Sequence, residues 1–504
     1  MTPVGRGFAW GPLLAAALAG ALLTFAFAPF DAWPLAIACP AVLMFLWEGA
    51  APGRAAALGF WFGAGTFGAG TWWLYISIHG FGGAPAWLTV LLILALVAIM
   101  AAYHALLGWL AARCLPAAGA WRWYVGLPAL WLLIEWWRGW FLSGFPWLSL
   151  GYSQIDTALA GYAPVTGIYG VSALLLVQAG ALLALWQGGT RQRVAAVGLV
   201  VLFWAGGVLL ERVNWTRPAG AGLPVAILQG AITPDEKWQL NHLEPTKTLY
   251  RTLNEQAFGA RLIVWPESAI PELANEIPRY LGEIQAESLA HEADVVMGVV
   301  RLGDNGEDYY NSILSLTTGV AFYDKQHLVP YAEYFPVPGF VRQWLRLMTL
   351  PYSDFRAGFP DQPPLVAGGA RLAPSICYED AFGSALIATE ARSNLLVNVT
   401  NDAWFGRSPA RYQHLQIARM RALESGRYLL RAANDGVSAL IGPRGELVGV
   451  AREYQPAVLR GTVFLRDGLP PYLQAGNRPV VWLGLAGLAA AVRRRLWAGR
   501  RPTG

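Results

Sequence analysis

The long apolar runs in the first 211 residues are the feature that most constrains the fold of this chain. A helix that crosses a bilayer needs about 20 consecutive, mostly apolar residues. Seven candidate runs precede residue 212, and an eighth lies near the C-terminus. They cover about 9–29, 34–50, 56–78, 85–112, 122–142, 160–187, 194–211 and 477–493. We therefore predict a polytopic α-helical membrane bundle with about eight transmembrane helices.

The charged residues are distributed as a membrane bundle requires. Only 11 of the 37 Lys and Arg and 32 Asp and Glu residues lie within residues 1–210, and the first Lys is Lys237. Charged residues make up 14% of the chain, against about 25% in a typical soluble protein. This composition excludes a disordered chain, a disulfide-stapled mini-domain and an ordinary cytosolic enzyme. The net charge of +5 comes partly from a basic C-terminal tail, so it does not indicate nucleic-acid binding.

Arg residues favour one side of the predicted bundle, and basic residues concentrate in cytoplasmic loops. If the N-terminus is cytoplasmic, only Arg138 falls in the opposite loops before the seventh helix. The cytoplasmic side then holds Arg6, Arg54, Arg113, Arg122, Arg191, Arg193 and the basic tail. Seven spans before residue 212 place the water-soluble part outside the cytoplasm, with both termini inside.

Two features of the membrane part have more than one interpretation. Gly144 and Pro146 interrupt the apolar pattern, so Ser143–Asp156 is either a surface loop or a re-entrant segment. Glu135 and Arg138 lie three residues apart on one helix face, where they can pair with each other. The alternative is that they contact a phospholipid head group, since ionisable residues within a membrane are often functional.

Residues 220–465 follow a different pattern, in which short β-rich runs alternate with helical stretches, as in layered α/β or α+β domains. The strand candidates are Val225–Gln229, Leu262–Trp265, Val295–Val300, Asn311–Leu316, Val320–Tyr323, Ser375–Tyr378, Leu395–Val399, Val437–Ile441 and Val458–Val463. The helix candidates are about 239–258, 277–292, 380–392 and 409–425. The segment 329–362 has no clear elements but many aromatic residues, so it is either an apolar lid at the membrane or a loop packed on its own domain.

Three polar or ionisable residues stand at the ends of apolar strand candidates in this part of the chain. They are Glu267 in Trp-Pro-Glu, Lys325 in Tyr-Asp-Lys and Cys377 in Cys-Tyr-Glu, and Glu333 comes eight residues after Lys325. Cys377 is the only Cys of the soluble part, and a lone Cys is either a buried small hydrophobe or a reactive thiol. The part contains no GxGxxG, P-loop, HExxH or CxxC pattern, so we expect no nucleotide cofactor and no metal.

A Cys, a Lys and a Glu together can carry out acyl transfer. The thiolate is the nucleophile, and a carboxylate can remove the thiol proton and return it to the leaving group. A fixed ammonium and a backbone N–H can stabilise the tetrahedral oxyanion. Each residue alone gives a weak signal, because a Glu or Lys at the end of a strand is more often solvated. The occurrence of all three residues in this order within one domain is a much stronger signal for acyl transfer.

The three motifs resemble those of the nitrilase or carbon–nitrogen hydrolase superfamily. That resemblance covers about 220–465 and implies an α-β-β-α sandwich with a Glu–Lys–Cys triad. With the preceding apolar helices and the segments Gly144–Trp147 and Gly151–Gln154, the whole chain resembles the bacterial apolipoprotein N-acyltransferase family. We then expect transmembrane helices 1–7 within 1–212 and an extracytoplasmic nitrilase-like domain over 220–465. An eighth helix with a cytoplasmic basic tail would cover 477–504.

The resemblance implies a reaction and a location for this chain. Glu267 is the general base and Cys377 attacks a phospholipid ester, typically of phosphatidylethanolamine, to form a thioester. The α-amine of the diacylglyceryl-modified N-terminal Cys of an apolipoprotein then takes the acyl chain, with ping-pong kinetics. The expected location is the bacterial inner membrane, with the catalytic domain on the periplasmic side and the protein a monomer.

The resemblance also implies roles for further residues. Lys325 stabilises the oxyanion with the backbone N–H of Tyr378. Glu333 orients the Lys, and Tyr378 and Glu379 match supporting residues of the family. Trp238 and Asn311 stand in matching contexts and are candidates for substrate binding.

Two other functions are compatible with parts of the pattern. A membrane-anchored amidase or nitrilase would share the triad, but a single anchor helix would suffice for it. A transporter with an external regulatory domain is disfavoured, because ionisable residues within the spans are few and the sequence shows no inverted repeat or paired broken helices.

Overall fold

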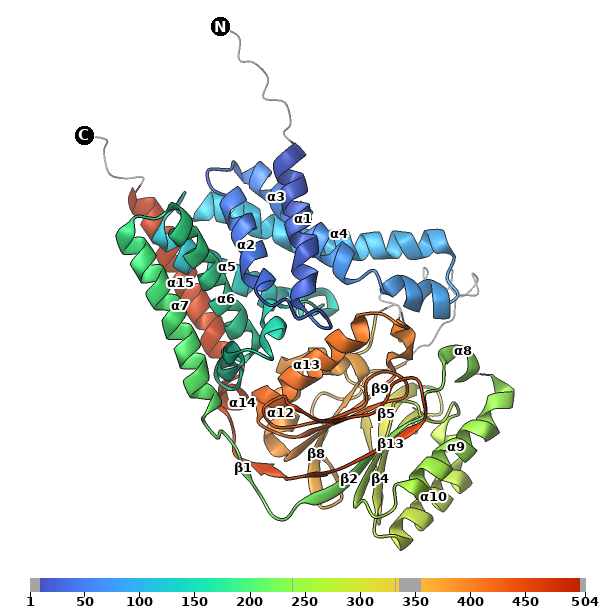
Figure 1. The fold of residues 1–504 in the computed structure, drawn as a ribbon. Helices are drawn as coiled ribbons and strands as arrows, with labels where there is room; N and C mark the ends of the chain where they lie inside the picture. The colour runs from blue at the N-terminus through green and yellow to red at the C-terminus, as the bar shows by residue number, and fades with distance from the viewer. Residues whose placement is uncertain (1–9, 238, 331, 335–354, 499–504) are drawn as a thin grey trace, which may run out of the picture. The chain divides into compact units, whose positions relative to one another are not determined.

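The computed structural model describes residues 10–237, 239–330, 332–334 and 355–498 (Figure 1). The chain forms two compact units. The first, which we call the helical unit, comprises Met1–Tyr75, Ala86–Val213 and Asn477–Gly504. The second, which we call the sandwich unit, comprises Ile76–Pro85 and Asn214–Gly476. A short piece of the N-terminal half therefore belongs to the second unit.

Apolar helices joined by short turns make up the helical unit. The α-helices are α1 (Trp10–Leu23), α2 (Leu35–Leu46), α3 (Pro52–Gly70), α4 (Ala86–Cys114), α5 (Leu127–Arg138), α6 (Ala163–Gln187), α7 (Thr190–Glu211) and α15 (Arg478–Ala498). Among the described residues, three helical stretches are long and apolar enough to cross a membrane: Ala86–Cys114, Ala158–Gln187 and Thr190–Glu211. They coincide with three of the predicted spans, whereas α1 and α2 are shorter apolar helices.

The segment Ser143–Asp156 is not a surface loop, so that alternative was wrong. It forms short 3-10 turns, including η5 (Leu150–Gln154), and Trp147–Gln154 is buried within the helical unit. Buried backbone outside a helix needs partners for its carbonyl groups. Arg138 supplies one of them, since its Nη1 donates to the Trp147 carbonyl oxygen at 2.8 Å. Its Nη2 also donates to the hydroxyl oxygen of Ser149 at 3.1 Å.

The expected ion pair between Glu135 and Arg138 was also wrong. Glu135 Oε1 accepts a hydrogen bond of 2.5 Å from Ser172 Oγ, and its Oε2 accepts one of 3.4 Å from the backbone N–H of Leu150. Among the residues that the structure describes, no ion pair joins Glu135 to Arg138. Each side chain binds a different part of the following segment, because the polar groups of that segment are buried and need partners.

Two six-stranded sheets dominate the described part of the sandwich unit. One has the order β13-β2-β3-β4-β5-β6, with β13 (Ala457–Val463), β2 (Leu223–Gln229), β3 (Leu262–Trp265), β4 (Asp294–Leu302), β5 (Tyr309–Leu316) and β6 (Val320–Asp324). The other has the order β12-β11-β10-β9-β8-β7, with β12 (Leu447–Val450), β11 (Ala439–Ile441), β10 (Leu429–Ala433), β9 (Leu395–Thr400), β8 (Ala370–Ile376) and β7 (Leu365–Ala367). Two short strands, β1 (Arg217–Pro218) and β14 (Arg466–Asp467), pair separately.

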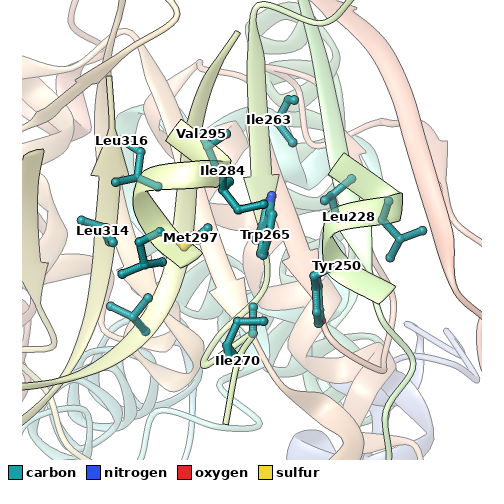
Figure 2. Packing of buried hydrophobic residues seen from close by; sticks show 14 of the residues in the cluster. Leu228, Tyr250, Ile263, Trp265, Ile270, Ile284, Val295, Met297, Leu314 and Leu316 are labelled. Atoms are coloured by element: carbon teal, nitrogen blue, oxygen red, sulfur yellow. The ribbon is translucent and has the colours of Figure 1, made fainter. Parts of the chain in front are cut away.

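The alternation of side chains along each strand fixes which residues lie between the sheets. In β2, Val225 and Ile227 join a core shared by both sheets, and Ala226 and Leu228 join a second core on the opposite face. Two helices cover that second core: α9 (Leu243–Gln256) and α10 (Pro278–Ala290). Figure 2 shows Leu228 and Trp265 from the strands beside Tyr250 of α9.

The helices α12 (Gly383–Arg392) and α13 (Ala410–Ser425) pack against the sheet that contains β8, β9 and β10. Leu415 and Ala418 of α13 pack against Leu396 of β9 and Leu429 of β10. The order of layers is therefore helices, sheet, sheet and helices. This confirms the predicted α-β-β-α sandwich.

The segment Ile76–Pro85 packs within the sandwich unit. It begins with one π-helical turn, η2 (Ile76–Phe81), although the sequence pattern had placed residues 56–78 in one membrane span. Ser77 Oγ donates a hydrogen bond of 2.7 Å to the Trp404 carbonyl oxygen, and the Phe81 ring meets the Trp404 ring edge-on. The helix α3 ends earlier, at Gly70.

Candidate active site

Three predicted site residues directly follow strands of the sandwich unit. Glu267 comes two residues after β3, Lys325 immediately after β6 and Cys377 immediately after β8. β3 and β6 belong to one sheet and β8 belongs to the other. The predicted strand Ser375–Tyr378 was therefore wrong at its end, because the chain leaves the sheet at Cys377 and enters the turn η9 (Cys377–Ala381).

Lys325 lies at the centre of a small group of carboxylates. Its side chain is 1% exposed, and its Nζ lies 2.8 Å from Glu333 Oε1 and 3.9 Å from Glu267 Oε1. Burial lowers the pKa of the Lys325 ammonium, but the two carboxylates outweigh burial and leave that pKa above its ordinary value. Lys325 therefore remains a fixed positive charge at every physiological pH.

The Asn311 amide joins the two carboxylates. Its Nδ2 donates to Glu267 Oε1 at 2.8 Å and to Glu333 Oε1 at 2.9 Å. Glu333 also accepts a hydrogen bond of 2.8 Å at Oε2 from the backbone N–H of Val329. Asn311 Oδ1 is buried and has no hydrogen-bond partner within the described part of the chain. Asn311 therefore orders the carboxylates and retains one acceptor for another group.

Cys377 has an unusual backbone and is partly buried. Its φ of +53° is in the left-handed region, which costs a residue with a Cβ about 1–2 kcal/mol. Its side chain packs against the core between the sheets. Burial raises the pKa of the Cys377 thiol, the Glu267 carboxylate raises it further, and Lys325 and a hydrogen bond with Thr400 partly offset the rise. The resting thiol is therefore protonated and needs a base.

Glu379 connects the Cys377 turn to the chain that follows Lys325. Its carboxylate accepts hydrogen bonds from the backbone N–H groups of Gln326 at 2.6 Å, His327 at 3.0 Å and Ile376 at 2.7 Å. The Tyr323 hydroxyl donates to the same carboxylate at 3.2 Å. Burial raises the pKa of Glu379 to about 7, and these donors and Lys325 oppose that rise. Glu379 thus links the ends of β6 and β8.

Tyr378 is the residue after Cys377. Its backbone N–H is therefore the candidate donor to an oxyanion formed at the thiol. Its ring meets Phe382 edge-on, with 4.9 Å between the ring centroids. Trp238, the other substrate-binding candidate, lies outside the described residues.

Several residues of the site gave no clear signal in the sequence. Lys237 is fully buried, and its Nζ donates to the Glu267 carbonyl oxygen at 3.2 Å. Burial lowers the pKa of Lys237 to about 8, while Glu267 acts in the opposite direction.

A second group of buried polar residues lies beneath Cys377. It consists of Asp380, Asn398, Asp402, His414 and Arg431, which come from η9, β9, the turn after β9, α13 and β10. Polar residues at the ends of buried strands were the available signal, as in Asn398-Val-Thr-Asn-Asp402.

The geometry supports covalent chemistry on a carbonyl group. A protonated thiol, a carboxylate and a permanently charged ammonium occur in one buried site, which are the groups that nucleophilic acyl transfer needs. Among the described residues, no group of three or more His, Cys, Asp or Glu side chains could hold a metal ion.

Comparisons with known proteins agree with both parts of the chain. Residues 19–182 match the apolipoprotein N-acyltransferase N-terminal domain, and residues 224–466 match the carbon–nitrogen hydrolase family. The apolipoprotein N-acyltransferase of Chromobacterium violaceum is 42% identical over 93% of this chain and 91% of its own length. Those of Methylococcus capsulatus and Pseudomonas aeruginosa are 40% and 42% identical, over 96% and 97% of this chain and 96% of each relative. The chain belongs to the apolipoprotein N-acyltransferase family.

Proposed function

We propose that this chain transfers an acyl chain from a membrane phospholipid to an apolipoprotein. The observation that carries the proposal is the grouping of Glu267, Lys325 and Cys377 in one unit. Lys325 Nζ lies 3.9 Å from Glu267 Oε1, and the charges of both residues act on the Cys377 thiol. Family membership supports the kind of acceptor, because the relatives named above are apolipoprotein N-acyltransferases.

The first half-reaction moves the acyl chain onto the enzyme. Glu267 takes the proton of the Cys377 thiol as the sulfur attacks the ester carbonyl carbon of a phospholipid, such as phosphatidylethanolamine. The oxyanion of the tetrahedral intermediate is stabilised by Lys325 and by the backbone N–H of Tyr378. The acyl C–O bond then breaks, Glu267 returns the proton to the leaving alkoxide, and the lysophospholipid departs.

The second half-reaction moves the acyl chain onto the acceptor. The free α-amine of the N-terminal diacylglyceryl-Cys of an apolipoprotein attacks the thioester, and the Cys377 sulfur leaves as the new amide forms. Glu267 accepts a proton from the amine and returns one to the sulfur. One product leaves before the second substrate reacts, so the kinetics are ping-pong.

The raised thiol pKa fits this order of events. A thiol that is protonated at rest reacts little with water-borne electrophiles, because the thiolate is the nucleophile. Proton transfer to Glu267 becomes favourable once an ester carbonyl stands next to Lys325, since the developing negative charge then meets a fixed cation. Glu333 and Asn311 hold Glu267 and Lys325 in place through bonds of 2.8–2.9 Å.

Both proposed substrates carry acyl chains, so we infer that the enzyme binds them while those chains remain in the membrane. We assign about eight transmembrane helices to residues 1–212 and 477–504, and a periplasmic catalytic domain to 220–465, with both termini cytoplasmic. The Arg asymmetry of the loops supports this orientation. Extracting a lipid chain into water costs about 0.8 kcal/mol per CH₂, so a monomer anchored in the inner membrane can leave the acyl chains in lipid.

Intact mass of the full-length protein in detergent micelles tests the covalent step. After incubation with phosphatidylethanolamine, the wild-type protein should gain the mass of one acyl group, and hydroxylamine should remove it because thioesters react with that nucleophile. Cys377→Ala should gain nothing. The two other Cys residues, Cys39 and Cys114, remain in both proteins and serve as internal controls. An equal adduct on Cys377→Ala, or lipopeptide acylation without Cys377, would rule out the thioester.

A further inference from the structure

A cluster of buried charges lies beneath the turn that carries Cys377. We call it the buried charge cluster; it consists of Asp380, Asn398, Asp402, His414 and Arg431, and all five are 0% exposed. They come from η9, β9, the turn η10 (Asp402–Phe405), α13 and β10. The proposed reaction uses none of these residues directly. Fully buried charges are costly unless they are paired, so a cluster of this size needs an explanation.

His414 is bound on both sides of its ring. Its Nδ1 lies 2.8 Å from Asp402 Oδ1, and its Nε2 lies 3.0 Å from Asp380 Oδ1 and 3.2 Å from the Cys377 carbonyl oxygen. All three partners are acceptors. A neutral imidazole has one N–H donor, whereas an imidazolium has two. The geometry therefore requires the doubly protonated, positively charged ring.

Arg431 completes the cluster. Its Nη2 donates to Asp402 Oδ2 at 2.8 Å, and its Nη1 donates to Asn398 Oδ1 at 2.6 Å and to Asp380 Oδ2 at 3.3 Å. With His414 charged, two cations balance two carboxylates. Asn398 Nδ2 in turn lies 3.4 Å from the Cys377 carbonyl oxygen. Two side chains of the cluster thus converge on the same backbone carbonyl.

The carbonyl that His414 and Asn398 bind belongs to Cys377, whose backbone conformation is unfavourable. The φ of +53° at Cys377 stands where β8 ends and η9 begins, and it persists only where the surroundings hold it. We propose that His414 is a positioning residue, whose imidazolium holds the Cys377 carbonyl and so keeps the thiol in register with Lys325 and Glu267. This inference rests on the proposed acyl transfer through Cys377.

The test compares two replacements of His414 in the full-length protein. His414→Asn keeps an amide near the Nδ1 position and loses the donor to the Cys377 carbonyl, whereas His414→Gln places an amide near Nε2 and restores that donor. We expect His414→Asn to slow acyl-enzyme formation from phosphatidylethanolamine by about 100-fold with an unchanged KM, because a displacement of about 1 Å can have this effect. His414→Gln should recover at least about 10-fold of the loss.

A second readout does not depend on acyl transfer. The rate of iodoacetamide alkylation of Cys377 at one mildly alkaline pH, followed by peptide mass, reports how strongly Lys325 acts on the thiol. His414→Asn should slow alkylation at that pH, because a sulfur displaced from the ammonium forms less thiolate. A role confined to stability would lower the melting temperature and leave this rate unchanged.

Matched variants keep the test decisive if His414→Asn folds poorly. The double variant Asp402→Asn with His414→Asn restores the charge balance, so it should fold better than the single variant and still acylate slowly. His291→Gln, at an exposed His that stacks on Phe258, is the control and should match the wild type. Wild-type acylation rates and wild-type alkylation rates in both His414 variants would overturn the positioning role. Acylation that survives Cys377→Ala would instead overturn the proposed reaction.

Discussion

The charges around Lys325 determine what each group in the site can do. Lys325 is almost completely buried and has Glu333 at 2.8 Å and Glu267 at 3.9 Å as its acidic neighbours. Burial raises the pKa of the Cys377 thiol, the Glu267 carboxylate raises it further, and the Lys325 ammonium lowers it. The ammonium is therefore the feature that makes attack on a carbonyl possible. Its removal should affect both stability and catalysis.

Replacing Lys325 by Met keeps most of the side-chain volume and removes the charge. Since this leaves two buried carboxylates without their partner, the free energy of unfolding should fall by about 3–5 kcal/mol. The loss of an oxyanion donor should slow acyl-enzyme formation by about 100-fold or more. Thermal unfolding and adduct mass measure the two effects. Lys247→Met is the control: it breaks a pair with the exposed Glu244, so it should cost less than about 1 kcal/mol and leave the rate unchanged. Equal losses in both variants would contradict this account.

His414 predicts how stability depends on pH. Burial and Arg431 lower the pKa of His414, but Asp380 and Asp402 outweigh them and raise it from 6.5 to about 9. A group whose pKa is raised on folding stabilises the protein fully below its unfolded pKa and loses that contribution as pH rises through the folded value. The melting temperature of the wild type should therefore exceed that of His414→Gln most at pH 6. The difference should shrink between pH 6.5 and 9. A difference that is constant or grows with pH would contradict a charged His414.

At the scale of elements, close packing of β4 against the turn after β3 fixes the position of Glu267. The backbone N–H of Gly298 in β4 donates to the Pro266 carbonyl oxygen at 3.2 Å, and its carbonyl accepts from the Ala269 N–H at 2.9 Å. A Cβ at Gly298 would lie 2.5 Å from Glu267 Cα, which is backbone and cannot move independently. Only Gly allows this approach.

Gly298→Ala should therefore displace Glu267 and reduce acyl-enzyme formation by about 100-fold, since misplaced catalytic groups have effects of that size. The adduct-mass assay measures it. Gly282→Ala in α10 is the matched control, because a Cβ there has no atom within 4 Å. That variant should keep full activity and gain up to about 1 kcal/mol of stability, as expected for Ala in place of Gly within a helix. Similar activities in the two variants would contradict the role of Gly298.

The elements also explain which parts of the site the sequence could predict. Glu267, Lys325 and Cys377 follow apolar strands, which the sequence pattern reveals. The sequence could therefore predict that these three residues belong to one site. β10 was missed because its apolar run is short and is interrupted by Arg431. The same Arg is paired in the buried charge cluster, and such pairing between distant segments leaves no local pattern. The left-handed turn at Cys377 was missed for a similar reason, since nothing in the residue type favours a positive φ.

At the scale of the whole molecule, the chain joins a helical unit with long apolar helices to a sandwich unit that holds Glu267, Lys325 and Cys377. The runs of apolar residues predicted that division, because a spanning helix and a strand of a sandwich have different lengths and periods. The segment Ile76–Pro85 is the exception to this division. Its apolar composition alone could not predict that it packs on Trp404 within the sandwich unit. The proposed thioester gives such an enzyme a reason to exclude water, because hydrolysis would compete with transfer to the amine acceptor.

The most direct test of acyl transfer to an apolipoprotein is the fate of the acyl-enzyme. The wild-type protein is loaded with phosphatidylethanolamine, freed of excess lipid, and mixed with either a diacylated lipopeptide or buffer alone. We predict that the acyl mass leaves Cys377 and appears on the N-terminal amine of the lipopeptide, while the adduct in buffer persists over the same time. Loss of the adduct to free fatty acid at equal rates in both samples, with no triacylated lipopeptide, would contradict the proposal and indicate a hydrolase.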